Sequence, residues 1–80
     1  MEDVIIEQMS LAFGQDLSGQ TLADCTPGAI SGWDSMSFLN LVVLLEEAFK
    51  VTIEIDDIPK MAVGGEAIAE VIKEKIGRQG

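Results

Sequence analysis

Apolar residues recur at three- and four-residue intervals in several segments, and this helical spacing limits what the chain can fold into. In residues 2–13 the residues that share one face of a predicted helix are Ile5, Ile6, Met9, Ala12 and Phe13. In residues 64–77 a second such face is formed by Ile68, Val71, Ile72 and Ile76. This last segment carries acids early and lysines late, which suits the helix dipole, and Gly77 is its predicted end.

A further helix is predicted from about residue 35 to residue 49. Nine of the twelve residues from 38 to 49 are apolar, so this helix should be buried on most sides. The segment KVTIEI, residues 50–55, alternates as a strand would, with Val51, Ile53 and Ile55 on one side. Because no other segment alternates in this way, we expect an extended connection packed on the core and no sheet.

Two shorter features complete the predicted fold. Residues 15–34 are rich in glycine and polar residues and predict a long loop, pinned to the core by Leu17, Leu22, Ile30 and Trp33. The segment DDIPKM, residues 56–61, offers an aspartate cap and Pro59 for the first turn of a short helix. The sequence therefore predicts one all-α domain over residues 1–80. We expect a small four-helix bundle with three main helices, one short third helix, a long first loop and a frayed tail at 77–80.

The charge is unbalanced, with fourteen acids against five bases and a net charge of −9. No Lys or Arg precedes Lys50. Such a chain should repel nucleic acid and anionic lipid headgroups, and should be attracted to basic surfaces of partner proteins. The chain starts with acids and has no membrane-spanning apolar run, and its single cysteine, Cys25, allows no internal disulfide. We therefore expect a cytoplasmic monomer without membrane insertion.

Side chains that commonly carry catalysis are scarce in this sequence. There is no His and no Tyr, no Cys–Cys or Cys–His metal spacing, and no glycine-rich phosphate loop after a strand. Asp56 and Asp57 are adjacent, but the pattern of a calcium loop does not surround them. We therefore expect a protein that is not an enzyme, with no catalytic residue and no metal site.

Ser35 stands at the start of the most apolar segment, within GWDSMSFLNLVVLLEEAF, residues 32–49. Either Asp34 or Ser35 could cap the helix that follows. A hydroxyl at a helix start also lies beside free backbone N–H groups and the positive end of the helix dipole, which favours a phosphate ester there. The position alone favours an ordinary helix cap over an attachment site.

The predicted helix over 35–49 has one weakly apolar stripe. It is formed by Met36, Asn40, Val43 and Glu47, which follow one another four, three and four residues apart. This arrangement would leave Met36 and Val43 near the surface among acids. Exposed apolar residues in such surroundings indicate a docking face rather than a core.

The same stretch, GWDSMSFLNLVVLLEEAF, resembles the signature of the acyl carrier proteins, in which Asp-Ser-Leu opens the second helix. The resemblance runs through most of the chain as far as AVGGEAIAEVIKEKI. It implies that Ser35 carries 4′-phosphopantetheine, donated from coenzyme A by a separate phosphopantetheinyl transferase that uses Mg²⁺. Asp34 and Met36 match the residues that flank this serine. The arm would hold carboxylic acids as thioesters, and the carrier itself would make no bonds.

The resemblance also implies contacts with partners and cargo. Glu46 and Glu47 match acids that meet basic docking patches on acyl-loading and acyl-processing enzymes, and Val43 falls at the apolar recognition position. Asn40 stands where many relatives carry an acid, and Met36 replaces the usual Leu. An acyl chain could retreat between the second helix and the third-helix region, where the candidate lining residues are Phe38, Leu39, Val42, Ile53, Ile58 and Met61.

Three functions are thus open at this point. The first is a carrier of acyl groups in fatty acid, polyketide or related specialised biosynthesis. The second is a carrier of aminoacyl or peptidyl groups, with the same chemistry but a different loading enzyme. The third is an unmodified acidic helical adaptor that binds a partner through Met36, Val43 and Glu47. Modification of Ser35 separates both carriers from the adaptor.

Overall fold

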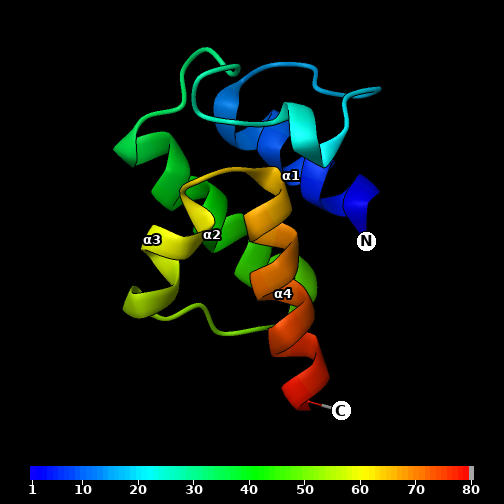
Figure 1. The fold of residues 1–80 in the computed structure, drawn as a ribbon, viewed down its shortest axis with the longest axis vertical. Helices are drawn as coiled ribbons and strands as arrows, with labels where there is room; N and C mark the ends of the chain where they lie inside the picture. The colour runs from blue at the N-terminus through cyan, green and yellow to red at the C-terminus, as the bar shows by residue number, and fades with distance from the viewer. Residues whose placement is uncertain (80) are drawn as a thin grey trace.

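The computed structural model describes residues 1–79, with side chains to residue 78. The described residues form four α-helices, which are α1 (Glu2–Phe13), α2 (Ser35–Phe49), α3 (Ile58–Met61) and α4 (Gly65–Gln79). Short 3₁₀ helices lie at Leu22–Asp24 (η1) and Ile55–Asp57 (η2). These residues contain no strand, which confirms the predicted all-α fold, and the helices pack as a small bundle around one core (Figure 1). None of the helices described is long and apolar enough to cross a membrane.

Helix α1 packs one face onto the core, as its spacing predicts. The buried residues of this face are Ile5, Ile6, Met9 and Phe13. Gly14 ends the helix in the left-handed conformation, with φ 64° and ψ 34°, and its N–H donates to the carbonyl of Ser10. Val4 and Leu11, which lie outside the predicted face, are 38% and 64% exposed.

The long loop between α1 and α2 lies against the core. Its buried side chains are Leu17, Leu22, Cys25 and Ile30. Trp33, at the end of the loop, stacks between Phe13 of α1 and Phe38 of α2, with ring centroids 4.9 Å and 5.9 Å away. The predicted anchors of the loop are thereby confirmed. Burial raises the pKa of the Cys25 thiol, which keeps it protonated at neutral pH.

The connection after α2 follows its prediction only in part. Val51 and Ile53 are buried as expected, but Ile55 is 84% exposed, so its predicted place on the core is wrong. The alternation stops because the chain turns into η2, whose first residue is Ile55. The carboxylate of Glu46 accepts the Ile53 N–H at 2.9 Å, which ties the connection back to α2.

An ion pair joins η2 to α4. Lys75 Nζ lies 2.6 Å from the Asp57 carboxylate, and the two side chains are only 11% and 15% exposed. The hydrogen bond from Lys75, together with one from the Glu54 N–H, lowers the pKa of Asp57. Pro59 lies in the first turn of α3, as predicted, but the carboxylate of Asp57 does not cap this helix.

Helix α4 begins where its backbone packs against the first loop. Gly64 and Gly65 are both buried. The Gly65 N–H donates to the carbonyl of Cys25 at 2.7 Å. A Cβ atom on Gly65 would lie 2.7 Å from the carbonyl oxygen of Leu22, so a residue with a side chain does not fit without a shift of backbone. The glycine pair therefore permits close packing of α4 on the loop.

The end of α4 differs from its prediction. The helix continues through Gly77 to Gln79, so the predicted end at Gly77 is wrong and residues 77–79 of the predicted tail are helical. Residue 80 lies outside the described residues. An ion pair between Arg78 and Glu74, 2.6 Å apart, spans this last turn. The final turns extend past the other helices (Figure 1), and Ile76 is accordingly 38% exposed.

Candidate functional site

The candidate site is the start of α2, and the end of the long loop positions it. Gly32 has a φ of 84°, which turns the chain just before Trp33. The side-chain amide of Gln15 donates to the carbonyl of Ser31, which holds the two ends of the loop together. Because Trp33 is stacked on both α1 and α2, the residues that follow it leave the core at a defined place.

Asp34 is the N-cap of α2. Its backbone is extended, with φ −132° and ψ 179°, and its carboxylate accepts the Ser37 N–H at 2.9 Å. Hydrogen bonding to Ser37 lowers the pKa of Asp34, so the carboxylate is ionised at neutral pH. Of the two residues that could have capped this helix, Asp34 is the one that does so.

Ser35 is the first residue of α2 and is exposed. Its hydroxyl makes no hydrogen bond to any other residue within the described part of the chain. The first backbone N–H groups of a helix have no acceptor inside the helix, and here Asp34 satisfies that of Ser37. An alcohol needs a base to become a nucleophile, and the chain has no His. Ser35 is therefore accessible to another molecule.

An apolar groove lies along the exposed face of α2, next to Ser35. We call it the α2 groove; its volume is about 480 Å³ and its lining residues are Ala12, Met36, Ser37, Leu39, Asn40 and Val43. Met36 is 82% exposed, and Leu39 and Val43 are each 51% exposed. The prediction that Met36 and Val43 lie near the surface is confirmed. Leu39 was not among the residues predicted for this face, although it stands three residues after Met36 and four before Val43.

The two acids at the end of α2 differ in their surroundings. Glu47 is exposed and makes no ion pair with a residue that the structure describes. Glu46 is half-buried, and its carboxylate accepts the Ile53 N–H. The fold thus uses Glu46 internally, while Glu47 remains available to a partner.

The residues predicted to line an acyl pocket fall into two groups. Those in the core are Phe38, Val42, Ile53 and Met61, with Ile58 packed against them. Leu39 is exposed on the outer face of α2 instead, where it lines the α2 groove. Neither these four core residues nor Ile58 line the α2 groove. A cavity among them would require their side chains to move apart, and this part of the prediction stays untested.

Together these features present an accessible hydroxyl on an anchored helix end, beside an apolar groove and an exposed acid. Such a surface can receive a covalent group and a protein partner. Over the described range 1–79, no three Cys, Asp or Glu side chains are grouped so that they could hold a metal ion. Compared with protein-family models, with curated proteins and with solved structures, the chain gives no match in any of the three comparisons.

Proposed function

We propose that this protein carries acyl groups as thioesters on a 4′-phosphopantetheine arm attached to Ser35. It would deliver them to enzymes of fatty acid, polyketide or related specialised biosynthesis. The observation that supports this most directly is the division of roles between neighbouring residues. Asp34 caps α2, so the hydroxyl of Ser35 is exposed and is not needed by the fold. The resemblance of residues 32–49 to the acyl carrier proteins supplies the identity of the attached group.

The surroundings of Ser35 are compatible with such an arm. Met36, the next residue, is 82% exposed, which leaves the helix start open to solvent. A phosphate ester on Ser35 would be stabilised by the positive end of the α2 dipole. When bound, the arm supplies a terminal thiol whose thioesters are more reactive toward nucleophiles than the free acids. Since the chain has no His, a separate phosphopantetheinyl transferase would have to provide the base that takes the Ser35 proton.

In this proposal the residues of the chain bind and position, and partner enzymes carry out the reactions. The α2 groove would provide the apolar contact, through Met36, Leu39 and Val43. Glu47 would attract the basic docking patches of acyl-loading and acyl-processing enzymes, while Asn40 weakens that attraction at its own position. Tethering on the arm raises the effective concentration of the cargo at each partner's active site.

The adaptor function is the second candidate, and the α2 groove is the observation that favours it. The groove is apolar and accessible without any modification of Ser35. A protein that used only this groove would bind a basic partner and carry no cargo. A carrier of aminoacyl or peptidyl groups would share Ser35 and differ only in its loading enzyme.

The test is the intact mass of the purified protein after incubation with coenzyme A, Mg²⁺ and a broad-specificity phosphopantetheinyl transferase. We expect the native chain to gain the mass of one phosphopantetheine unit. The Ser35→Ala variant should gain nothing. The Ser31→Ala variant, changed at an exposed serine of the loop before α2, is the matched control and should be modified like the native chain.

A folded, previously unmodified sample that gains no mass would contradict the carrier function and favour the adaptor. Gain of mass by Ser35→Ala would show that another residue is modified. Circular dichroism of each variant checks that the helices are intact, and a loading assay with fatty, malonyl and amino acids then separates the two kinds of carrier.

A further inference from the structure

The outward face of α1 carries apolar residues where a solvated face is normally polar. Met9 is fully buried, and Leu11 follows it by two residues, about 200° further around the helix. Leu11 is therefore directed away from the core and is 64% exposed. Val4, seven residues earlier, lies on the same face and is 38% exposed. This face has no partner element among the described residues.

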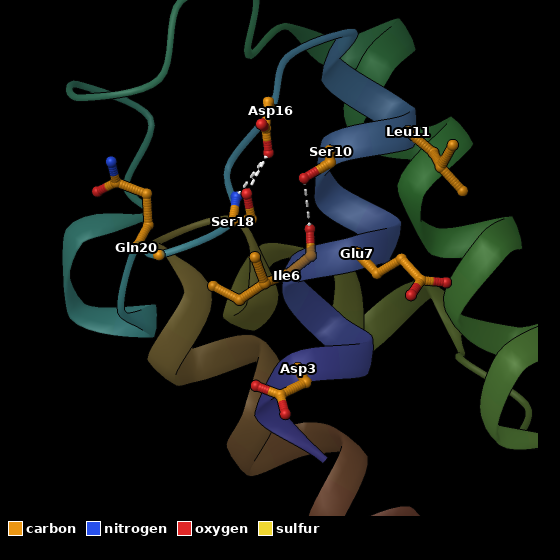
Figure 2. A pocket seen from close by; sticks show the side chains of 9 residues that line it. Asp3, Ile6, Glu7, Ser10, Leu11, Asp16, Ser18 and Gln20 are labelled. Carbon is orange, nitrogen blue, oxygen red and sulfur yellow. Dashed lines mark hydrogen bonds between the residues drawn. The ribbon is translucent and has the colours of Figure 1, made fainter.

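A hollow of about 430 Å³ lies beside this face, between α1 and the loop that follows it (Figure 2). We call it the α1 hollow. Its lining includes Ile6 and Leu11, which make it partly apolar. Figure 2 shows Asp3 and Glu7 on α1 and Asp16 on the loop around it. Ser18 donates to Asp16 through its N–H at 3.0 Å, and hydrogen bonds from Ser18 lower the pKa of this carboxyl.

The charges of the α1 hollow are not balanced within the protein. Asp3, Glu7 and Asp16 have no ion-pair partner in the described range, and no Lys or Arg occurs before Lys50. Asp3 and Glu7 stand four residues apart on one helix face, where like charges repel. None of these acids belongs to a described group that could hold a metal ion. A ligand that complements the α1 hollow therefore carries cationic side chains next to apolar ones.

We propose that the α1 hollow and Leu11 form a second docking surface, which binds a basic amphipathic segment of a partner protein. An apolar side chain of the segment would cover Leu11, and its Lys or Arg residues would lie among Asp3, Glu7 and Asp16. A second copy of the chain is disfavoured as the occupant, because each copy carries a net charge of −9. The surface does not include Ser35 and does not depend on the carrier function.

The test is a titration of the isotope-labelled protein, followed by nuclear magnetic resonance, with a synthetic helix-forming peptide of leucine and arginine. We expect shift changes at α1 and the loop after it. Leu11→Ser should weaken binding about fivefold or more, because the apolar contact is lost. Val63→Ser is the matched control, since Val63 and Leu11 are 67% and 64% exposed. It should change the affinity by less than about twofold.

Three results would overturn the proposal. The first is an equal loss of peptide affinity in Leu11→Ser and Val63→Ser, when circular dichroism shows that both variants are folded. The second is a set of shift changes confined to the α2 groove. The third is equally tight binding of a matched peptide of leucine and glutamate. Binding to the Ser35→Ala variant should be unchanged, so failure of this proposal is distinguishable from failure of the carrier function.

Discussion

Helices α2 and α4 are both fifteen residues long, yet their first turns are built in opposite ways. The start of α2 is held by a side chain, the carboxylate of Asp34, and Ser35 beside it is exposed. The start of α4 packs directly on the backbone of the first loop, because Gly65 lies against the carbonyl of Leu22. A helix end that is capped by its own side chain leaves room for an added group. A helix end that is packed against backbone leaves no room even for a methyl group.

The outward faces of the two helices also differ, because that of α2 is partly apolar and that of α4 is mostly charged. The exposed residues of α2 include Met36, Leu39 and Val43, all apolar. Those of α4 include Glu66, Glu70, Lys73 and Glu74. A charged outward face is stable in water, whereas an exposed apolar face gains free energy when a partner covers it. On the proposed function, partners would therefore dock on α2, while the outward face of α4 would stay in water.

The largest effect should come from filling the space at the start of α4. Gly65→Ala would place a Cβ atom 2.7 Å from a backbone oxygen, and we expect a loss of about 2 to 3 kcal/mol in the free energy of unfolding. Chemical denaturation measures this. Gly28→Ala, where a Cβ atom meets nothing within 4 Å, is the control. An unchanged stability of Gly65→Ala would show that the loop can move away from α4.

The ion pair between Asp57 and Lys75 comes next. Both side chains are largely shielded, so Asp57→Asn should lower the free energy of unfolding by about 1 to 2 kcal/mol at neutral pH. The pKa of Asp57 is lowered in the folded state, so its stabilisation is present above the ordinary value of 3.8 and is lost as the pH falls through the folded-state pKa. Melting curves across this range should show a smaller acid-induced loss in the variant. Identical pH profiles of stability in the native chain and in Asp57→Asn would show that the ion pair does not stabilise the fold.

Reversing one charge on α2 and one on α4 tests whether only the outward face of α2 binds basic partners. If the carrier function holds, Glu47→Lys should slow reactions with basic partner enzymes by roughly fivefold at low salt, and less at high salt. Glu66→Lys, which changes an exposed acid on α4, should have little effect. The measurement is the rate of modification or loading at two ionic strengths. Equal effects of both changes would mean that only net charge matters.

Substitutions of two neighbouring residues at the start of α2 should show that the cap and the proposed attachment point have separate roles. Asp34→Ala removes the acceptor of the Ser37 N–H and should lower the melting temperature by roughly 4 to 8 °C. Ser35→Ala removes a hydroxyl without a partner and should leave the melting temperature nearly unchanged. Thermal denaturation compares the two. A larger loss in Ser35→Ala would contradict the separation of their roles.

The smallest effect should come from the end of α4. Gly77 is exposed within the helix, and a Cβ atom there meets nothing within 4 Å. Gly77→Ala should therefore raise the free energy of unfolding by about 0.5 kcal/mol, because alanine favours a helix over glycine. Denaturation of this variant beside Gly65→Ala tests both glycines of α4. Destabilisation by Gly77→Ala would mean that this helix end is not regular in solution.

Local spacing was sufficient to predict the main helices. The faces around Met9, Leu41 and Ile72 are buried because apolar residues at helical intervals must meet other apolar surface. The same argument correctly left Met36 and Val43 outside. Prediction failed for Ile55 and Gly77, because an alternating pattern and a glycine each allow more than one backbone conformation.

The sequence by itself therefore determined the all-α fold, the buried helix faces and the short list of residues able to carry chemistry. Only the tertiary structure decided which of Asp34 and Ser35 caps α2, on which side Leu39 lies, and why residue 65 is a glycine. The cap is a local contact, but it depends on the residue at which α2 begins, and periodicity fixes a helix start only to within a residue or two. The other two questions depend on how segments far apart in the chain pack, as Leu22 packs on Gly65, and periodicity within one segment holds no information about that packing.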